Sequence, residues 1–552
     1  MKLETKLCSS LVKIMPEKAP EGAAYKKGQA LRGEVFSFQL AYLPCDFQRG
    51  EIEVEVVSDL EKYISWRKVE LVPVNYPGCL FDDDYLFKTA GMYPDRLEKV
   101  SVKPLYSVQG QWRSLWSKVA LPADVPAGVH DIAVTLSATS AEGKKCRVRN
   151  VFKLEVIPLT LPEQTLTFTN WFHADCIASF YKFEVFSEEH WHALENFFKS
   201  AAAHGVNLLL TPLFTLPLDT GVGLERPTCQ LVKVFCRKGE YSCDFSLLDR
   251  WVDLARRCGI YKFEMSHLFT QWGAKFTPKI MADVDGAERR IFGWDVKADS
   301  EAYADFIAAF LPALVEYLKK KNLQDNVYFH CSDEPQTEHK KNYCYAAELL
   351  KKYLGGFKVM DALSSVDFYR LGYVNYPVPI ESHIEDFIAE NVPELWTYYC
   401  CGPAQVYPNR LIAMPSSRSR ILGALLYYYN VKGFLHWGFN FYFSQFSAGL
   451  IDPYKCTDAD SAFPAGDAFI VYPGPGGVPE DSLRHEVFFE ALQDQRALQL
   501  LEKFMPRKKI LALLDKSVDS GRMNMADYPR GEPAVLALRK KINTLLKKYA
   551  KN

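Results

Sequence analysis

The sequence pattern changes at a short proline-bounded segment, Pro158–Pro162 (Pro-Leu-Thr-Leu-Pro), and this change constrains the fold more than any other feature. Before it, short runs of alternating apolar and polar residues are separated by turn residues. After it, apolar strand-like runs alternate with longer helix-like segments eight times. Because such segments are stiff and domain boundaries lie in linkers, we predict a boundary here, with residues 1–160 and 161–504 as separate domains.

Residues 1–160 carry the pattern of an antiparallel sheet protein. The turn Pro126-Ala-Gly precedes one alternating run, an arrangement familiar from immunoglobulin-like sandwiches. Similar turn residues separate the other runs. We therefore predict an N-terminal antiparallel β-sandwich built from the runs Val35–Tyr42, Ile52–Val57, Val69–Val74, Trp116–Leu121, His130–Leu136 and Val148–Ile157.

Residues 161–504 contain eight strand–helix alternations, which favours a closed (β/α)8 TIM-like barrel over an open doubly wound sheet. The predicted strands are Leu166–Phe172, Val206–Leu210, Tyr261–Met265, Val327–His330, Phe357–Met360, Gly372–Asn375, Leu395–Tyr399 and Gly433–Trp437. The predicted helices are Glu188–Ala203, Phe245–Cys258, Ser300–Lys321, one that begins near His339, His383–Glu390, Ser419–Tyr429 and Leu483–Lys503. Residues 505–552 are basic and helical, and we expect this C-terminal extension to pack on the outside of the barrel.

Two adjacent carboxylates, Asp333 and Glu334, follow the fourth predicted strand of the barrel. In (β/α)8 enzymes the catalytic residues lie at the carboxyl ends of the strands and in the loops beyond them. A second interpretation fits the same residues, because Ser332 followed by two acids and Pro335 is also a good helix start. The predicted barrel favours the catalytic interpretation.

Many aromatic residues also lie at the predicted strand ends, and an acid pair in an aromatic-lined cleft suits cleavage of a glycosidic bond, in which one carboxyl group protonates the leaving oxygen. The adjacency of the two acids then points to a particular division of labour. Two carboxyl groups that act as nucleophile and acid flank the scissile bond from opposite sides, which normally places them on different strands. Neighbouring acids suit a mechanism in which Glu334 protonates the glycosidic oxygen and Asp333 orients a 2-acetamido group of the substrate. The acetamido oxygen then attacks the anomeric carbon, so the substrate supplies the nucleophile.

A series of short motifs extends this interpretation along the chain. It comprises Asn170-Trp171-Phe172, Thr211-Pro212-Leu213-Phe214, Ser266-His267-Leu268-Phe269 with Trp272-Gly273, Ser332-Asp333-Glu334-Pro335, Trp396-x-Tyr398-x-Cys400, Gly433-Phe434-Leu435-His436-Trp437, and Asp467-x4-Tyr472-Pro473-Gly474 with Ser482-Leu483-Arg484-x-Glu486. The series spans roughly residues 30–500 and resembles glycoside hydrolase family 123.

The resemblance implies a β-sandwich followed by a (β/α)8 barrel, as the sequence pattern also predicts. It further implies a β-N-acetylgalactosaminidase that retains configuration through an oxazoline-type intermediate. In that scheme Asp333 orients the acetamido group and Glu334 is the general acid/base. The broader relatives of the family share the scaffold without an assigned function.

Further candidates for substrate binding lie at the strand ends: Asn170, Trp171, His267, Trp272, Asp361, Tyr398 and Trp437. We expect Tyr398 to donate a hydrogen bond to the acetamido oxygen. Trp171 and Trp437 should form the floor of the sugar site. Asp361 should contact the axial hydroxyl that distinguishes galacto from gluco sugars. Each has a structural alternative. The aromatic residues can simply pack, His267 can rest against Trp272, and Asn170 and Asp361 can cap a loop or helix.

Composition excludes several other functions. The formal net charge is −1, which offers no electrostatic footprint for nucleic acid, and no apolar run is long enough for membrane insertion. No phosphate-binding loop or zinc spacing occurs, and the 14 cysteines are irregularly placed, so we expect no cofactor and no metal.

The first residues lack the apolar stretch of a secretory signal, so we expect a cytoplasmic protein, or a secreted or periplasmic one if a signal was trimmed.

The leading hypothesis is therefore a β-N-acetylgalactosaminidase that acts on a glycan or glycolipid carbohydrate, with the oligomeric state left open. Two alternatives remain at this point. One is a glycosidase on another sugar with a protein carboxylate such as Asp361 as nucleophile. The other is a catalytically silent carbohydrate-binding protein on the same scaffold.

Overall fold

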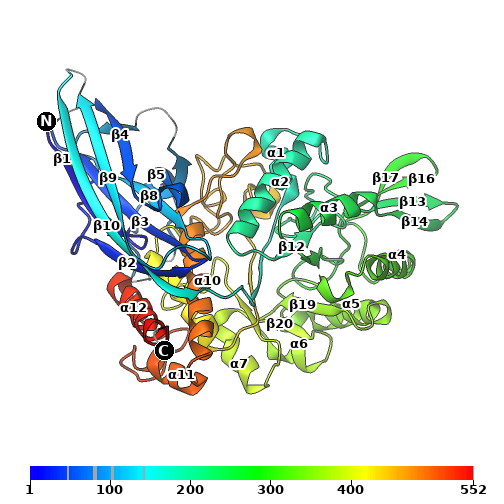
Figure 1. Cartoon of the computed structure of the whole chain (residues 1–552). Coiled ribbons are helices and arrows are strands. Elements are labelled where there is room, and N and C mark those ends of the chain that lie inside the picture. Colours follow the sequence, from blue (N-terminus) through cyan, green and yellow to red (C-terminus); the bar gives the residue numbers. More distant parts are fainter. Residues whose placement is uncertain (47–48, 79–81, 83, 101–104, 141–142, 551–552) are drawn as a thin grey trace. The chain divides into compact units, whose positions relative to one another are not determined.

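The computed structural model describes all residues except 47–48, 79–81, 83, 101–104, 141–142 and 551–552. The chain forms two compact units, each built from more than one stretch of sequence (Figure 1). The first unit comprises Met1–Gln164, Ala404–Tyr429 and Glu480–Asn552, and the second comprises Thr165–Pro403 and Asn430–Pro479. After the predicted boundary near residue 160, the chain therefore returns twice from the second unit to the first.

The first unit contains two five-stranded sheets, which confirms the predicted antiparallel sandwich. Their strand orders are β1-β3-β8-β5-β6 and β2-β10-β9-β4-β7, and among these pairs only β2 and β10 run parallel. Inward side chains of both sheets, such as Phe38, Leu115 and Phe152, form one core. The bounds are β1 Leu3–Ser9, β2 Lys27–Arg32, β3 Val35–Pro44, β4 Arg49–Val57, β5 Ile64–Val74, β6 Gly91–Lys99, β7 Leu105–Val108, β8 Arg113–Ala120, β9 Gly128–Ser140 and β10 Lys145–Thr160.

Among its described residues, the first unit also contains five α-helices: α8 Ser416–Arg420, α9 Leu422–Tyr428, α10 Leu483–Glu502, α11 Arg507–Asp515 and α12 Gly531–Tyr549. The sequence predicts residues 505–552 on the outside of the barrel, whereas α12 contacts β2, β10 and α10. The physical reason is Arg539, which is buried on the inner face of α12 and pairs with Glu34 and Asp494.

The second unit is a nearly closed barrel of eight parallel strands, as predicted. Their order is β20-β19-β18-β15-β12-β11-β22-β21, and a parallel bridge between Ile380 and Tyr398 joins the two edge strands. The bounds are β11 Thr167–Asn170, β12 Leu208–Thr211, β15 Lys262–Met265, β18 Val327–Phe329, β19 Lys358–Ala362, β20 Tyr376–Val378, β21 Trp396–Tyr398 and β22 Gly433–His436. The sixth strand, β20, lies after the predicted Gly372–Asn375, because Gly372 occupies a turn with a φ of +72°.

The barrel helices are α1 Ala174–Tyr181, α2 Glu188–Ala203, α3 Ser246–Arg257, α4 Glu301–Lys320, α5 Lys340–Tyr353, α6 Val366–Arg370 and α7 Ile384–Ala389. The side chains of Ser187 and Ser300 cap α2 and α4 by accepting backbone N–H bonds, which explains where these helices begin. None of the helices that the structure describes is both long and apolar enough to span a bilayer.

A small four-stranded sheet interrupts the barrel pattern and was not foreseeable from the strand–helix alternation. Its order is β14-β13-β16-β17, with bounds β13 Lys233–Arg237, β14 Glu240–Asp244, β16 Ile280–Val284 and β17 Ala287–Phe292. One hairpin follows β12 and the other follows β15. The long connections after these two barrel strands are therefore ordered structure rather than open loops.

Candidate active site

The carboxyl ends of the barrel strands surround a cavity of about 120 Å³. The predicted acid pair lies in its wall, in the loop after β18. The residues around the cavity are Trp171, Leu218, Asp219, Gln271, Trp272, Asp333, Glu334, Ala362, Tyr398, Cys400, Cys401, Leu435, Trp437, Phe463 and Asp467. Aromatic rings and carboxyl groups thus face the same small space, which suits binding of a sugar ring.

The loop that carries the acid pair is fixed by backbone hydrogen bonds on both sides. The backbone N–H of Glu334 donates to the carbonyl of Ala362 at 3.1 Å, and that of Trp272 donates to the carbonyl of Asp333 at 3.0 Å. Glu334 and Trp272 both have positive φ angles, +43° and +55°, which non-glycine residues rarely adopt. Strain of this kind persists where the surrounding structure imposes it, commonly at functional sites.

The immediate surroundings of the pair act on the pKa of Asp333. Burial raises the pKa of Asp333 well above its usual range, and the neighbouring charge of Glu334 raises it further. The Tyr398 hydroxyl donates to Oε1 of Glu334 at 2.6 Å. Burial, together with the charge of Glu334, raises the pKa of Tyr398 well above its usual value, so the phenol remains a donor.

Behind the pair, a fully buried histidine lies between two further carboxylates. His330 Nε2 is 2.5 Å from Oε1 of Glu264, and His330 Nδ1 is 3.1 Å from Oδ1 of Asp361. Burial alone lowers the pKa of His330, but the hydrogen bonds to Asp361 and Glu264 and their charges outweigh it and raise the pKa to about 9. His330 is therefore an imidazolium at neutral pH.

The two carboxylates also hold side chains around them. Glu264 accepts hydrogen bonds from Trp171 Nε1 and from the Thr169 hydroxyl, both at 2.6 Å. Asp361 accepts from the Tyr343 hydroxyl at 2.6 Å and from the backbone N–H of Cys331 at 3.0 Å. The indole of Trp171, which faces the cavity, is thus fixed by a carboxylate at the end of β15.

A comparison with protein families shows the family to which this chain belongs. The catalytic-domain model of glycoside hydrolase 123 matches residues 171–501, which is more than half of the chain. The chain belongs to glycoside hydrolase family 123. It is therefore a glycosidase, and its cavity at the carboxyl ends of the barrel strands is the candidate active site.

One solved structure gives the same fold. A family 123 glycoside hydrolase from Clostridium perfringens, described in a study of glycolipid glycan hydrolysis, covers 100% of this chain and of its own at 15% identity, with a TM-score of 0.76. A PapD-like domain of human CEP192 covers 28% of this chain and 84% of its own at 7% identity, with a TM-score of 0.15, too low to bear on the fold. A search of curated proteins finds no match.

Most of the site residues predicted from the sequence of this family 123 chain line the cavity, and they come from five different strands and loops. These are Trp171, Trp272, Asp333, Glu334, Tyr398 and Trp437. Tyr398 contacts Glu334 in the free protein, and the Trp437 Nε1–H donates to Oδ2 of Asp467 at 2.9 Å. The structure therefore gathers the acid pair and the aromatic residues around one cavity.

The other predicted residues, Asn170, His267 and Asp361, do not line the cavity. Asp361 is completely buried and bound by three donors, so it cannot contact an axial hydroxyl of the sugar. His267 stacks on His330 with ring centroids 4.1 Å apart, rather than resting against Trp272. Asn170 is 2% exposed. The error is one of side-chain direction, because these residues occupy strand ends but face the interior.

Several polar residues of the site were missed by the sequence-based prediction. Asp219 and Gln271 come from the long connections after β12 and β15, and the Asp219 N–H donates to Oε1 of Gln271. Burial raises the pKa of Asp219 to about 6. Asp467 could have been identified from the sequence by its place in the late motif Asp467-x4-Tyr472-Pro473-Gly474. Glu264 could have been identified because it is a carboxylate inside a predicted barrel strand.

One cluster, His267, His330 and Asp361, has donor atoms within 4.8 Å of one another, the spacing that a metal ion needs. However, both ring nitrogens of His330 are engaged by carboxylates, and its raised pKa keeps them protonated. A metal ligand must be the neutral imidazole. These residues therefore fit an internal ion pair better than a metal, and the absence of a metal requirement stays a prediction.

Proposed function

We propose that this protein is a β-N-acetylgalactosaminidase that retains configuration by substrate-assisted catalysis. The observation that carries the proposal is the adjacency of Asp333 and Glu334 on one constrained loop, beside an aromatic-lined cavity. A catalytic pair that flanks the bond from opposite sides requires two separate loops. Two neighbouring carboxyl groups instead reach the leaving oxygen and the adjacent 2-acetamido group from the same side.

In this mechanism Glu334 donates a proton to the glycosidic oxygen while the acetamido oxygen attacks the anomeric carbon. Asp333, as a carboxylate, accepts the hydrogen bond of the acetamido N–H and balances the positive charge of the oxazolinium ion that forms. Glu334 then removes a proton from the water that opens this ion, so the configuration is retained. No step requires a cofactor.

We assign Tyr398 a change of hydrogen-bond partner in this cycle. In the free protein its hydroxyl donates to Glu334. Transfer of this hydrogen bond to the acetamido oxygen would free Oε1 of Glu334 for the glycosidic oxygen and would stabilise the attacking oxygen. Substrate binding would then also free Glu334 to act as the acid.

The protein-nucleophile alternative is disfavoured by the position of Asp361, the residue suggested for that role. Its carboxylate is fully buried and bound to His330, Tyr343 and the Cys331 N–H. The substrate class follows the structural relative, which was described in a study of glycolipid glycan hydrolysis, and we propose terminal β-GalNAc of glycans or glycolipid headgroups.

The test is turnover of aryl β-GalNAc, aryl β-GlcNAc and aryl β-galactoside by the wild type and by Asp333→Asn and Glu334→Gln. We expect turnover of the acetamido sugars only, with Asp333→Asn about 10²–10⁴-fold slower. Because an aryl leaving group needs little protonation, Glu334→Gln retains more of the first step. Glu338→Gln, an exposed acid four residues further on, is the matched control and should be unchanged. Equal turnover of the galactoside would refute substrate assistance, and sugar binding without any turnover would favour the silent binding protein.

A further inference from the structure

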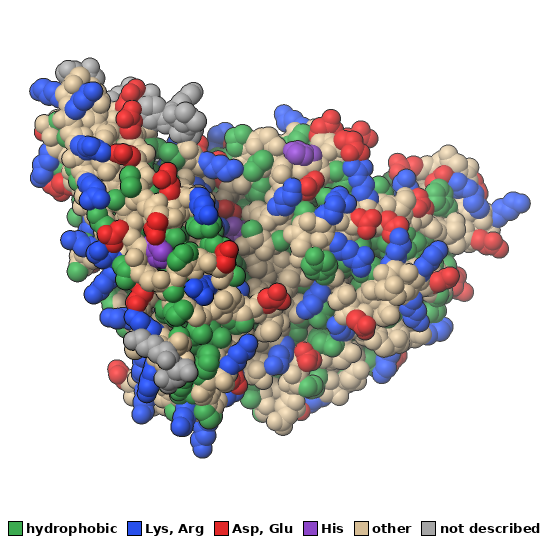
Figure 2. Space-filling model, viewed as in Figure 1, with side chains coloured by type: hydrophobic (Ala, Val, Ile, Leu, Met, Phe, Trp, Pro, Cys, Tyr) green, Lys and Arg blue, Asp and Glu red, His purple; other side chains and the backbone are tan. Residues whose placement is uncertain are grey.

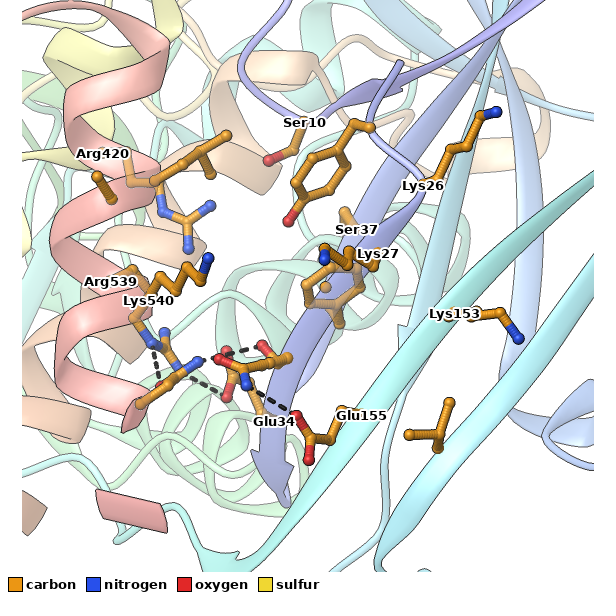
Figure 3. A pocket seen from close by; sticks show the side chains of 18 of the residues that line it. Ser10, Lys26, Lys27, Glu34, Ser37, Lys153, Glu155, Arg420, Arg539 and Lys540 are labelled. Atoms are coloured by element: carbon orange, nitrogen blue, oxygen red, sulfur yellow. Dashed lines mark hydrogen bonds and ion pairs between the residues drawn. The ribbon is translucent and has the colours of Figure 1, made fainter. Parts of the chain in front are cut away.

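A second cavity, of about 530 Å³, lies within the first unit (Figure 3). Its walls come from the segment before β2, from β2, β3 and β10, and from the helices α8 and α12. Small-molecule sites have volumes of about 300–1,000 Å³. The cavity is thus large enough for a monosaccharide-sized ligand, and all of its lining belongs to one unit.

The lining of this cavity carries an excess of positive charge. Six cationic side chains line it beside two acids, Glu34 and Glu155: Lys26, Lys27, Lys153, Arg420, Arg539 and Lys540. Three of the six are paired with acids, Lys153 with Asp131, Arg420 with Glu490 and Asp494, and Arg539 with Glu34 and Asp494. Both acids are already engaged: Glu34 pairs with Arg539 at 2.7 Å, and Glu155 binds Gln29 and Lys547. Lys26, Lys27 and Lys540 form no ion pair with any residue that the structure describes, so an anion would complete the site.

Two neutral polar atoms in the lining also lack a partner. The Ser37 hydroxyl, on a residue 4% exposed, and Oε1 of Gln29 make no hydrogen bond within the described part of the chain. The Gln29 amide NH2 donates to Glu155 at 2.8 Å, which directs its oxygen. A carbonyl oxygen can only accept, so an anion cannot satisfy it. The complementary ligand must therefore carry hydroxyl groups as well as a negative charge.

An apolar wall completes the description of the cavity. The rings of Tyr25 and Phe36 line it and rest on Phe152, with centroid separations of 5.5 and 5.6 Å. Gly28 lets the Phe36 ring lie close to β2, because a Cβ atom there would be 2.3 Å from that ring. Aromatic surfaces of this kind match the C–H face of a sugar ring.

We propose that this cavity is a second carbohydrate site that binds an acidic sugar, one bearing a carboxylate or sulfate group. The anionic group pairs with the free lysines, the hydroxyl groups bind Gln29 and Ser37, and the C–H face lies on Tyr25 and Phe36. A neutral sugar leaves the lysines unpaired, an alkyl carboxylate leaves Oε1 of Gln29 unsatisfied, and an inorganic anion does not use the aromatic wall.

The test is calorimetric titration of the full chain carrying Glu334→Gln, which suppresses hydrolysis. Methyl β-glucuronide and galactose 6-sulfate should bind saturably, and methyl β-galactoside, hexanoate and inorganic sulfate about tenfold more weakly or not at all. The combined Lys27→Ala and Lys540→Ala change should weaken the acidic sugars about tenfold or more. Ala537→Trp, which fills the cavity from α12, should abolish their binding.

Lys541→Ala is the matched control, because this exposed lysine is adjacent to Lys540 but does not line the cavity. It should leave the affinity within about twofold of the parent. The proposal is overturned if neither acidic sugar binds, if hexanoate binds as tightly, or if the two lysine changes leave the affinity intact. Because the readout is binding, these outcomes are independent of whether the barrel cleaves β-GalNAc.

Discussion

His330 carries one positive charge among three carboxyl groups, those of Glu264, Asp361 and Asp333. It forms ion pairs with the first two, and its charge lowers the pKa of Asp333 against the larger effects of burial and Glu334. The imidazolium therefore acts through the acid pair rather than on the substrate, as a positioning residue. Its charge sets the pH at which Asp333 becomes the carboxylate that the proposed mechanism requires.

Replacement of this residue, His330→Gln, should shift the pH profile of kcat/KM. Without the cation the pKa of Asp333 rises further, so the carboxylate forms only at higher pH and the acidic limb of the profile moves upward. Tyr343→Phe removes a hydrogen bond to Asp361 but no charge, and should lower activity without moving the limb. The measurement is turnover of an aryl substrate from pH 4 to 9, and an unmoved limb in His330→Gln would contradict this role.

The same substitution should affect stability in a pH-dependent way. Removal of one partner of a buried ion pair costs about 3–5 kcal/mol. The pKa of His330 is about 9 in the folded protein and 6.5 as its ordinary value, so its stabilisation is fully present below about pH 6.5 and is lost as the pH rises through about 9. Urea unfolding of wild type and variant should therefore differ most at pH 6 and converge above pH 9. A difference that grows with pH would contradict the assignment of charge.

Tyr398→Phe tests the hydrogen bond to Glu334. A hydrogen bond to a charged group contributes about 1.5–3 kcal/mol, and in this proposal it also stabilises the attacking acetamido oxygen. We expect kcat to fall about 10–100-fold with a smaller change in KM. Steady-state kinetics on aryl β-GalNAc measure both values. A change confined to KM would indicate that Tyr398 contributes only to binding.

The acid pair could be predicted at the residue level because its position after a barrel strand fixes its neighbourhood. The directions of single side chains could not. Asp361 and His267 lie at strand ends as expected, but both turn into the network around His330. Glu264 lies within a strand, where only the assembled barrel shows that it joins Trp171 to His330.

Among the barrel elements, β21 and β22 pack through an unusually close contact. A Cβ atom on Gly433 of β22 would lie 2.0 Å from the indole of Trp396 on β21. These two strands end at Tyr398 and just before Trp437, so their separation positions two residues of the active site. The glycine is thus required for a close approach, not for a special backbone angle.

Gly433→Ala should therefore destabilise the protein by about 1–3 kcal/mol, the usual cost of overpacking. Activity should fall as well, because the displaced strands carry Tyr398 and Trp437. Gly355→Ala is the matched control, since a Cβ atom there meets nothing within 4 Å. Denaturant unfolding and kcat/KM check both effects, and equal stability of the two variants would show that Trp396 yields without cost.

At the element level, long amphipathic helices and buried strands could be predicted because their periodicity is local. The predicted Glu188–Ala203 has the bounds of α2. The four-stranded sheet of β13, β14, β16 and β17 could not be foreseen, because its two hairpins come from separate connections and its strands are only partly buried. Strand β20 was misplaced because Pro377 is its central residue and Pro379 follows its last one, and proline argues against a strand assignment.

At the scale of the whole molecule, the relevant features are the distribution of surface charge and the connectivity of the chain. Figure 2 shows Lys and Arg side chains interspersed with Asp and Glu over the face in view, in keeping with the net charge of −1. The first unit is made of three separate stretches of the chain. Buried pairs join the first and the third of these stretches: Arg67 with Glu486 at 2.5 Å, Asp95 with Arg484 at 2.9 Å, and Glu34 with Arg539 at 2.7 Å.

A fragment of residues 165–552 should consequently fail to fold as a soluble monomer. It would keep Arg484 and Glu486 but lose Asp95 and Arg67, the partners that neutralise them, and buried charges without partners are strongly destabilising. Sedimentation of the expressed fragment beside the full chain, followed by thermal unfolding of any soluble material, measures this. A soluble fragment with a cooperative transition would show that the second unit folds without the sheets.

This connectivity also imposes an order on events during translation. Arg67 and Glu486 are separated by 419 positions, and synthesis at about 5–20 residues per second leaves the earlier one waiting for about 20–80 s. Throughout that interval the nascent sheets expose unpaired charged side chains and an uncovered face to solvent or to a chaperone. The amino-terminal part of the enzyme must therefore remain competent for docking until the last helix leaves the ribosome.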